Sequence, residues 1–145
     1  MRRLAKSRRV LVASPDYLKR FGTPTSLGEL KGHRAVIYSN RGDIDWRFRV
    51  GRRWTSATPQ TALRVNNGLL MRDAVVAGLA MALLPTFFLQ SALKNRSLVA
   101  VDVGVEPEAA VIYVAYPEDL RKSPKIGALT EWLRRAFGDP PYWDV

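Results

Sequence analysis

Residues 8–32 read RRVLVASPDYLKRFGTPTSLGELKG, and this stretch decides the fold. The run Arg8–Ala13 is β-branched and apolar without a breaker, which predicts a buried strand. Ser14 can cap a helix and Pro15 suits its first position, so the strand should lead directly into a short helix. Ser26–Glu29 has the serine-x-x-glutamate spacing of a capping box, which predicts a second helical turn. A strand followed at once by two capped turns indicates a chain that leaves one lobe and begins another.

The rest of the chain alternates between strand and helix patterns. Alternating apolar and basic residues, followed by Gly51-Arg52, predict a hairpin at residues 46–54. A fully apolar strand at 80–84 is typical of a sheet covered on both faces. Further strands are expected at 33–39, 61–65, 97–103 and 110–116, and helices at 69–78, 86–93 and 123–137. This order predicts an α/β fold.

Composition limits the classes of protein. With 145 residues and 47% hydrophobic residues, the chain is long enough to bury a core as one unit or as two small lobes. It contains no cysteine, which excludes disulfides and thiolate metal sites and fits a cytoplasmic location. The apolar run after the basic start, Val10–Ala13, is too short for a membrane span or a signal peptide, so no membrane partner is expected.

The net charge of +10 favours anionic partners. Basic residues gather in Met1–Arg20, where Asp16 is the one acid, and in a second cluster at Arg47–Arg53. Such clusters are most often solvated strand edges, and no zinc-finger or aromatic RNA-binding motif accompanies them. A basic nucleic-acid or anion-binding module stays open as the alternative.

The best candidate for a binding site is Asn66-Asn67-Gly68, where a strand ends and a helix begins. Amide groups at a helix N-terminus hold anions, and the carboxyl ends of strands border the cleft in α/β proteins. Asn67 could donate a hydrogen bond to a ligand carboxylate, beside the amides of Gly68 and Leu69. Alternatively Asn67 only caps the helix, and both roles can hold together.

Other candidate residues border the same expected cleft. Tyr38, Ser39 and Asn40 end a strand that should face it. Trp46 could form a wall, although ordinary core packing is the more frequent role of such an aromatic residue. The weaker candidates are Ser14, Pro85 and Thr86.

Catalysis and metal binding find little support in the residues. His33 is the single histidine and has no cysteine beside it, so no metal site is expected. Asp43 and Asp45 are paired carboxylates on a polar loop that shows no sign of desolvation, and Arg41-Gly-Asp43 is a short adhesion-like match that loop composition explains. No nucleophile elbow and no nucleotide-binding loop is present in the sequence. We therefore expect no enzyme activity and no cofactor.

Four stretches, taken in order, resemble the effector-binding domain of LysR-type transcriptional regulators. They are RRVLVASPDYLKRFGTPTSLGELKGHRAVIYS (8–39), WRFRVGRRW (46–54), ALRVNNGLLMRDAVVAGLAMALLP (62–85) and VIYVAYPEDLRKSPKIGALTEWLRRAF (111–137). Each motif is loose by itself, and the four in family order are specific.

The resemblance implies a type 2 periplasmic-binding-protein-like fold of two α/β lobes with an effector in the cleft. Lobe two would be complete at residues 14–104, lobe one would be partial at 1–13 and 105–138, and 139–145 would be an irregular tail. The resemblance also points to Asn66-Asn67-Gly68 as the site of a small organic anion. DNA would be bound only by a helix-turn-helix domain that this sequence lacks, so the sequence is interpreted as a fragment.

Two structural expectations follow from that interpretation. Leu11 and Ile112 should lie in one common sheet. The apolar helix face Ile126, Leu129, Leu133 and Phe137 should lack its full sheet, so the chain should self-associate to cover it. Such a chain could also act as an oligomerisation partner of full-length regulators.

Overall fold

The computed structural model describes residues 1–41 and 46–144. Its strands are β1 (Arg2–Ser7), β2 (Arg9–Ala13), β3 (Arg34–Tyr38), β4 (Arg47–Val50), β5 (Arg53–Ser56), β6 (Gln60–Val65), β7 (Ala82–Pro85), β8 (Val99–Ala100), β9 (Glu106–Pro107) and β10 (Ala110–Val114). β2 lies between β7 and β8 and is antiparallel to both. β3 and β6 are parallel, and a bridge between Ala35 and Met81 joins β3 to the residue before β7.

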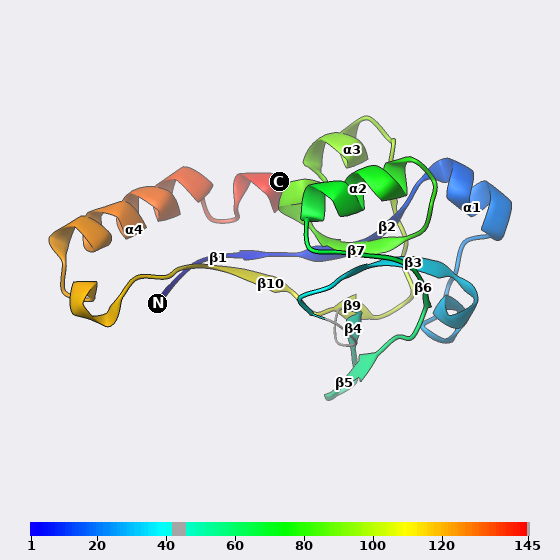
Figure 1. The fold of residues 1–145 in the computed structure, drawn as a ribbon, viewed down its shortest axis with the longest axis horizontal. Helices are drawn as coiled ribbons and strands as arrows, with labels where there is room; N and C mark the ends of the chain where they lie inside the picture. The colour runs from blue at the N-terminus through cyan, green and yellow to red at the C-terminus, as the bar shows by residue number, and fades with distance from the viewer. Residues whose placement is uncertain (42–45, 145) are drawn as a thin grey trace.

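Two helices cover one face of β2 and β7, and the C-terminal helix lies over a separate pair of strands. The helices are α1 (Pro15–Phe21), α2 (Gly68–Val76), α3 (Gln90–Lys94) and α4 (Pro124–Phe137), with 3-10 turns η1 (Gly28–Gly32), η3 (Thr86–Phe88), η4 (Glu118–Leu120) and η5 (Tyr142–Asp144). Figure 1 shows α2 and α3 above β2 and β7, whereas β1 and β10 run out together beneath α4. The chain is therefore a compact α/β body with a projecting two-stranded arm.

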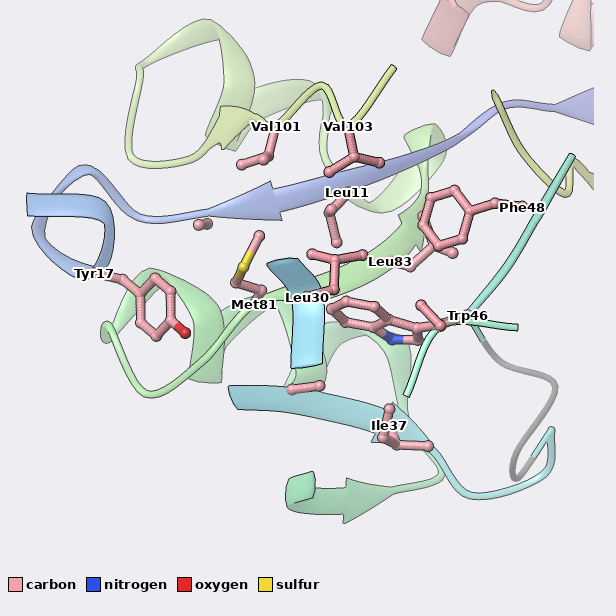
Figure 2. Close-up of a cluster of buried hydrophobic side chains, with 13 residues drawn as sticks. Leu11, Tyr17, Leu30, Ile37, Trp46, Phe48, Met81, Leu83, Val101 and Val103 are labelled. Atoms are coloured by element: carbon pink, nitrogen blue, oxygen red, sulfur yellow. The ribbon is translucent and has the colours of Figure 1, made fainter. Parts of the chain in front are cut away.

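The core consists of two clusters on opposite faces of β2 and β7. Leu11 and Leu83 belong to the first cluster, whose buried side chains Figure 2 shows. Val12 and Leu84, the next residue along each strand, belong to the second cluster, beneath α2. Because successive side chains of a strand point to opposite faces, a strand that is apolar throughout must be buried on both. This confirms the prediction for residues 80–84.

The local signals form much as the sequence predicts. Ser14 caps α1, since the backbone N–H of Tyr17 donates to its Oγ atom at 3.1 Å. Residues 47–56 form the predicted hairpin, in which Val50 pairs with Arg53. Gly78 ends the turn after α2 with a φ of +79°, a backbone conformation that glycine adopts without strain.

The expectation that Leu11 and Ile112 share a sheet is wrong. Leu11 pairs with Leu83 in β7, whereas Ile112 pairs with Ala5 in β1. The predicted single strand Arg8–Ala13 is in fact the second of two, and the chain changes pairing partner at Arg8. β1 was not recognised as a strand because its sequence, RRLAKS, is mostly polar although its buried and exposed residues alternate.

Two other local predictions need correction. Ser26 does not complete a capping box, because the Glu29 carboxylate accepts a hydrogen bond from the backbone N–H of Thr25 at 2.8 Å. The predicted irregular tail contains the turn η5, and Trp143 within it is buried against the rings of Phe87 and Phe137. Aromatic packing with sequence-distant partners thus orders this segment.

The face of α4 is better covered than the sequence suggested. Thr130 is buried, and Ile126, Leu133 and Phe137 are half-buried over the β1–β10 arm. Leu129 and Trp132 stay exposed, at 45% and 65%. The arm therefore replaces part of the sheet that was expected to be missing.

The division into lobe two at 14–104 and remnants at 1–13 and 105–138 stays a prediction. The pairing of β2 with β7 argues for a boundary nearer Ser7 than Ala13. Asp43 and Asp45 lie outside the described residues, and so do the last two residues of the Arg41-Gly-Asp43 match. Within the described ranges, no helix combines the length and the apolar character that crossing a bilayer requires.

Candidate functional site

The candidate site is a cavity of about 300 Å³ where several strands end. Tyr38 ends β3, Pro85 ends β7, and Gly68 begins α2 shortly after the end of β6. Since β3 and β6 are parallel and Tyr38 pairs with Val65, their carboxyl ends meet at this edge. The lining residues are Arg9, Tyr38, Arg41, Gly68, Met71, Leu83, Leu84, Pro85, Phe87, Phe88 and Ala110.

The cavity is largely apolar and carries two cations. Arg9 is 6% exposed, and its Nη2 atom donates to the carbonyl oxygen of Leu83 at 3.0 Å. Arg41 forms an ion pair with Glu108, which also lies 3.5 Å from Nη1 of Arg47. No acidic side chain is among the described residues that line the cavity. Both guanidinium groups of the cavity are thus held in place by partners within the protein, Arg9 by a backbone carbonyl and Arg41 by a carboxylate.

Gly68 is required by close packing at the cavity wall. A Cβ atom at this position would lie 2.5 Å from Cε2 and Cζ of the Phe88 ring. Any larger residue would push the ring of Phe88 aside and reshape the cavity, because packed interiors leave little room for an extra methyl group.

Asn67 caps α2 at the rim. Its Oδ1 atom accepts hydrogen bonds from the backbone N–H groups of Leu69 at 2.9 Å and Leu70 at 3.1 Å. The capping role that the sequence left open is therefore present, and it uses only the oxygen of the amide. The Nδ2 group is a separate donor, so the predicted role in effector binding stays a prediction.

Replacing Asn67 by alanine should lower the free energy of unfolding by about 1 kcal/mol, because two N–H groups of α2 lose their acceptor. Asn67→Ser should retain most of that stability, since serine caps about as well as asparagine. Urea unfolding followed by circular dichroism measures both changes. Equal losses in the two variants would contradict a capping role.

The remaining sequence candidates lie elsewhere or on the surface. Ser14 is at the far end of β2 from Arg9, about 16 Å away for five residues of strand. Trp46 is 1% exposed within the first core cluster, which is the ordinary core packing that the sequence also allowed. Figure 2 shows its ring among Leu30, Leu83 and Ile37. Neither side chain lines the cavity.

Thr86 belongs to a polar cluster that holds the tail. Its Oγ1 atom lies 3.0 Å from Oγ of Ser7 and donates to the Asp144 carboxylate. Ser39, Asn40 and Asn66 are exposed. Asn40 donates from Nδ2 to the Tyr38 hydroxyl oxygen at 3.2 Å, which places it next to one lining residue.

Sequence reasoning missed four important lining residues, namely Arg9, Arg41, Phe87 and Phe88. Arg9 looked like one of several surface cations in Met1–Arg20, and its burial depends on its pairing with Pro85 across β2 and β7. Gly68, directly after Asn67, was the one feature of the sequence that could have indicated Phe88, because a glycine at a helix start allows another residue to approach closely.

A mixed sheet buried on both faces, with a cavity at the carboxyl ends of its strands, defines a small-molecule-binding domain of the α/β class. The chain belongs to the LysR substrate binding domain family, which matches residues 1–138. The resemblance inferred from the sequence is thereby confirmed.

Individual relatives agree with this assignment. The chain is 31% identical over 137 residues to the HTH-type transcriptional regulator YhjC of Escherichia coli K12, covering 91% of this chain and 45% of that protein. It is 27% identical to the HTH-type transcriptional activator TtdR of the same organism, covering 94% and 46%. The chain thus spans about half the length of these curated relatives. Because the family and these relatives are regulatory, the prediction that the chain is not an enzyme is confirmed.

Solved structures show the same fold. The regulatory domain of CrgA from Neisseria meningitidis matches with a TM-score of 0.70 and 22% identity, over 94% of this chain and 68% of that one. Full-length AphB from Vibrio cholerae, a member of the LTTR family, matches with a TM-score of 0.68 and 23% identity, over 92% and 46%. The predicted α/β fold of a LysR regulatory domain is confirmed.

Proposed function

We propose that this chain is the effector-sensing part of a LysR-type transcriptional regulator and that the cavity at the strand ends takes a small organic anion. The observation that carries the proposal is the pair Arg9 and Arg41 in an otherwise apolar lining. A guanidinium group binds a carboxylate through two parallel hydrogen bonds, and the surrounding Met71, Leu83 and Phe88 suit an apolar body.

The rim would supply further polar contacts to the bound anion. Tyr38 lines the cavity, and Asn67 precedes the lining residue Gly68. The amide groups at the start of α2 add a partial positive charge that favours an anion. Ser39, Asn40 and Asn66 belong to the same edge of the sheet and are proposed as secondary contacts.

The remaining partners of the regulator are proposals of the same kind. We assign DNA contact to a helix-turn-helix domain outside this chain, as the names of the relatives suggest. The chain would work in the cytoplasm as a homo-oligomer, in which the anion alters how the copies are arranged. The exposed Leu129 and Trp132 on α4 support association between copies.

The proposal is tested with benzoate and benzamide, which have nearly the same shape and differ in charge. Titration of the labelled chain by NMR should give saturable shifts with benzoate, at the amides of Gly68 and Phe88. Benzamide should produce little change at the same concentrations. Equal shifts with both compounds would contradict an anion site.

Arg41→Gln should weaken benzoate binding about 10-fold or more, because a hydrogen bond to a charged group contributes about 1.5–3 kcal/mol. Arg47→Gln is the matched control, since Arg47 also lies beside Glu108 but does not line the cavity. Isothermal titration calorimetry measures both affinities. Unchanged benzoate affinity in Arg41→Gln would refute the role of that residue.

A further inference from the structure

The β4–β5 hairpin is a basic ribbon that the proposed anion site does not use, and it is exposed except for the buried Phe48 and the half-buried Arg47. Figure 1 shows β5 at the lower end of the molecule, well away from α2, α3 and α4. All four residues of β5 are exposed, and β5 pairs with β4 alone, as an edge strand. The sequence of the ribbon, RFRVGRRWTS, contains four arginines and no acidic residue.

Hydrogen-bond register gathers the cations around one aromatic ring. Arg49 lies directly opposite Trp54, and the guanidinium carbon atoms of Arg47 and Arg49 lie 5.4 and 5.9 Å from the centroid of the Trp54 ring. Stacking of this kind holds flexible arginine side chains in place above the ring. Arg52 and Arg53 add two more exposed cations at the turn.

We propose that this hairpin contacts the phosphate backbone of double-stranded DNA. Arginine forks match phosphate oxygens, and the hydroxyl group of Ser56, which shares a face of the hairpin with Arg49 and Trp54, can donate to the same oxygens. A two-stranded ribbon is also narrow enough to enter the major groove. The contact is electrostatic and independent of base sequence.

The composition of the ribbon favours DNA over an acidic protein. Four arginines stand here against two large apolar side chains, Trp54 and Val50, each 45% exposed, so positive charge dominates the surface of the ribbon. A surface of arginine and hydroxyl groups is typical of protein–DNA contacts. This inference about the hairpin rests on the proposed function, in which another domain of the same regulator also binds DNA. The hairpin would then add contacts outside the recognition site.

The test compares two triple variants of the full chain. Arg49→Gln/Arg52→Gln/Arg53→Gln removes three cations from the hairpin. Lys31→Gln/Lys94→Gln/Arg96→Gln removes three exposed cations elsewhere and is the matched control. Fluorescence anisotropy with a labelled duplex of arbitrary sequence gives the affinity between about 50 and 200 mM salt. Thermal melting verifies that all three proteins remain folded.

Three phosphate contacts contribute about −2.7 to the slope of log affinity against log salt, which is a loss of about 40-fold across that range. The hairpin variant should lose this slope, and the control variant should retain it. Equal losses in both variants would show attraction to net charge alone, and an unchanged hairpin variant would exclude the contact. Tighter hairpin-dependent binding to a polyglutamate peptide than to the duplex would overturn the proposal in favour of an acidic protein partner. The benzoate titration is independent of all these outcomes.

Discussion

Replacing Trp46 by alanine is expected to lower the free energy of unfolding by about 3–5 kcal/mol. The side chain is 1% exposed and lies in the first core cluster with Leu30, Ile37 and Leu83 (Figure 2). Its removal leaves a cavity that the neighbouring strands cannot fill, because β3 and β7 are held by their own hydrogen bonds. Urea unfolding measures the loss, followed by the backbone signal in circular dichroism because this signal does not depend on the replaced tryptophan.

Two further variants test whether the loss of stability comes from the removal of a buried core side chain. Trp54→Ala is the matched control, since Trp54 is 45% exposed and its loss should cost about 1 kcal/mol or less. Trp46→Phe should be milder than Trp46→Ala, because the Nε1 atom of Trp46 is buried with no hydrogen-bond partner among the described residues. If Trp46→Ala were no more harmful than Trp54→Ala, the tryptophan would not be part of the core.

Converting Leu129 and Trp132 of α4 to glutamate is expected to make the chain monomeric. Both side chains are large, apolar and exposed, and they lie beside the half-buried Leu133. Burying the pair between two copies would contribute about 1.5–3 kcal/mol for each side chain on each copy. Two carboxylates in that position would instead have to lose water without a partner. Light scattering coupled to size exclusion at micromolar concentration measures the mass.

The control for this change is Lys19→Glu on α1, which Figure 1 shows at the opposite end of the molecule from α4. Lys19 is exposed, and its replacement alters the net charge by the same two units away from the apolar pair. The unmodified chain and Lys19→Glu should both have the mass of an oligomer. A monomer in the unmodified chain would remove the basis for association through α4.

The predictions that succeeded rest on short stretches of chain. The cap of α1 by Ser14, the hairpin after Val50 and the stop at Gly78 each depend on residues fewer than about five positions apart. The burial of β7 on both faces could likewise be read from an uninterrupted apolar run. Backbone preferences and the alternation of side chains along a strand depend on neighbouring residues, so both can be predicted directly from the sequence.

Two of the predictions that failed concern partners far apart in the chain. β1 was missed because its residues are basic, and its pairing with β10 joins positions more than a hundred residues apart. The order of the tail was missed because Trp143 packs on Phe87 and Phe137. A third failure is local: the Glu29 carboxylate accepts its hydrogen bond from the backbone N–H of Thr25 instead of Ser26, a shift of one residue that composition does not fix.

For the candidate site, the sequence located the edge and the tertiary structure located the cavity. Tyr38, Gly68 and Pro85 could be named in advance, because strand ends and a glycine at a helix start are visible in the sequence. Arg9 and Phe88 could not, since their positions depend on the register between β2 and β7 and on the turn after β7. Alone, this sequence determined its α/β class, its family and the edge of the sheet at which the cavity lies. The presence of Arg9 in the cavity lining was decided only by the packing of strands about 70 residues apart, because long-range register follows from the fit of whole side-chain faces and not from any local preference.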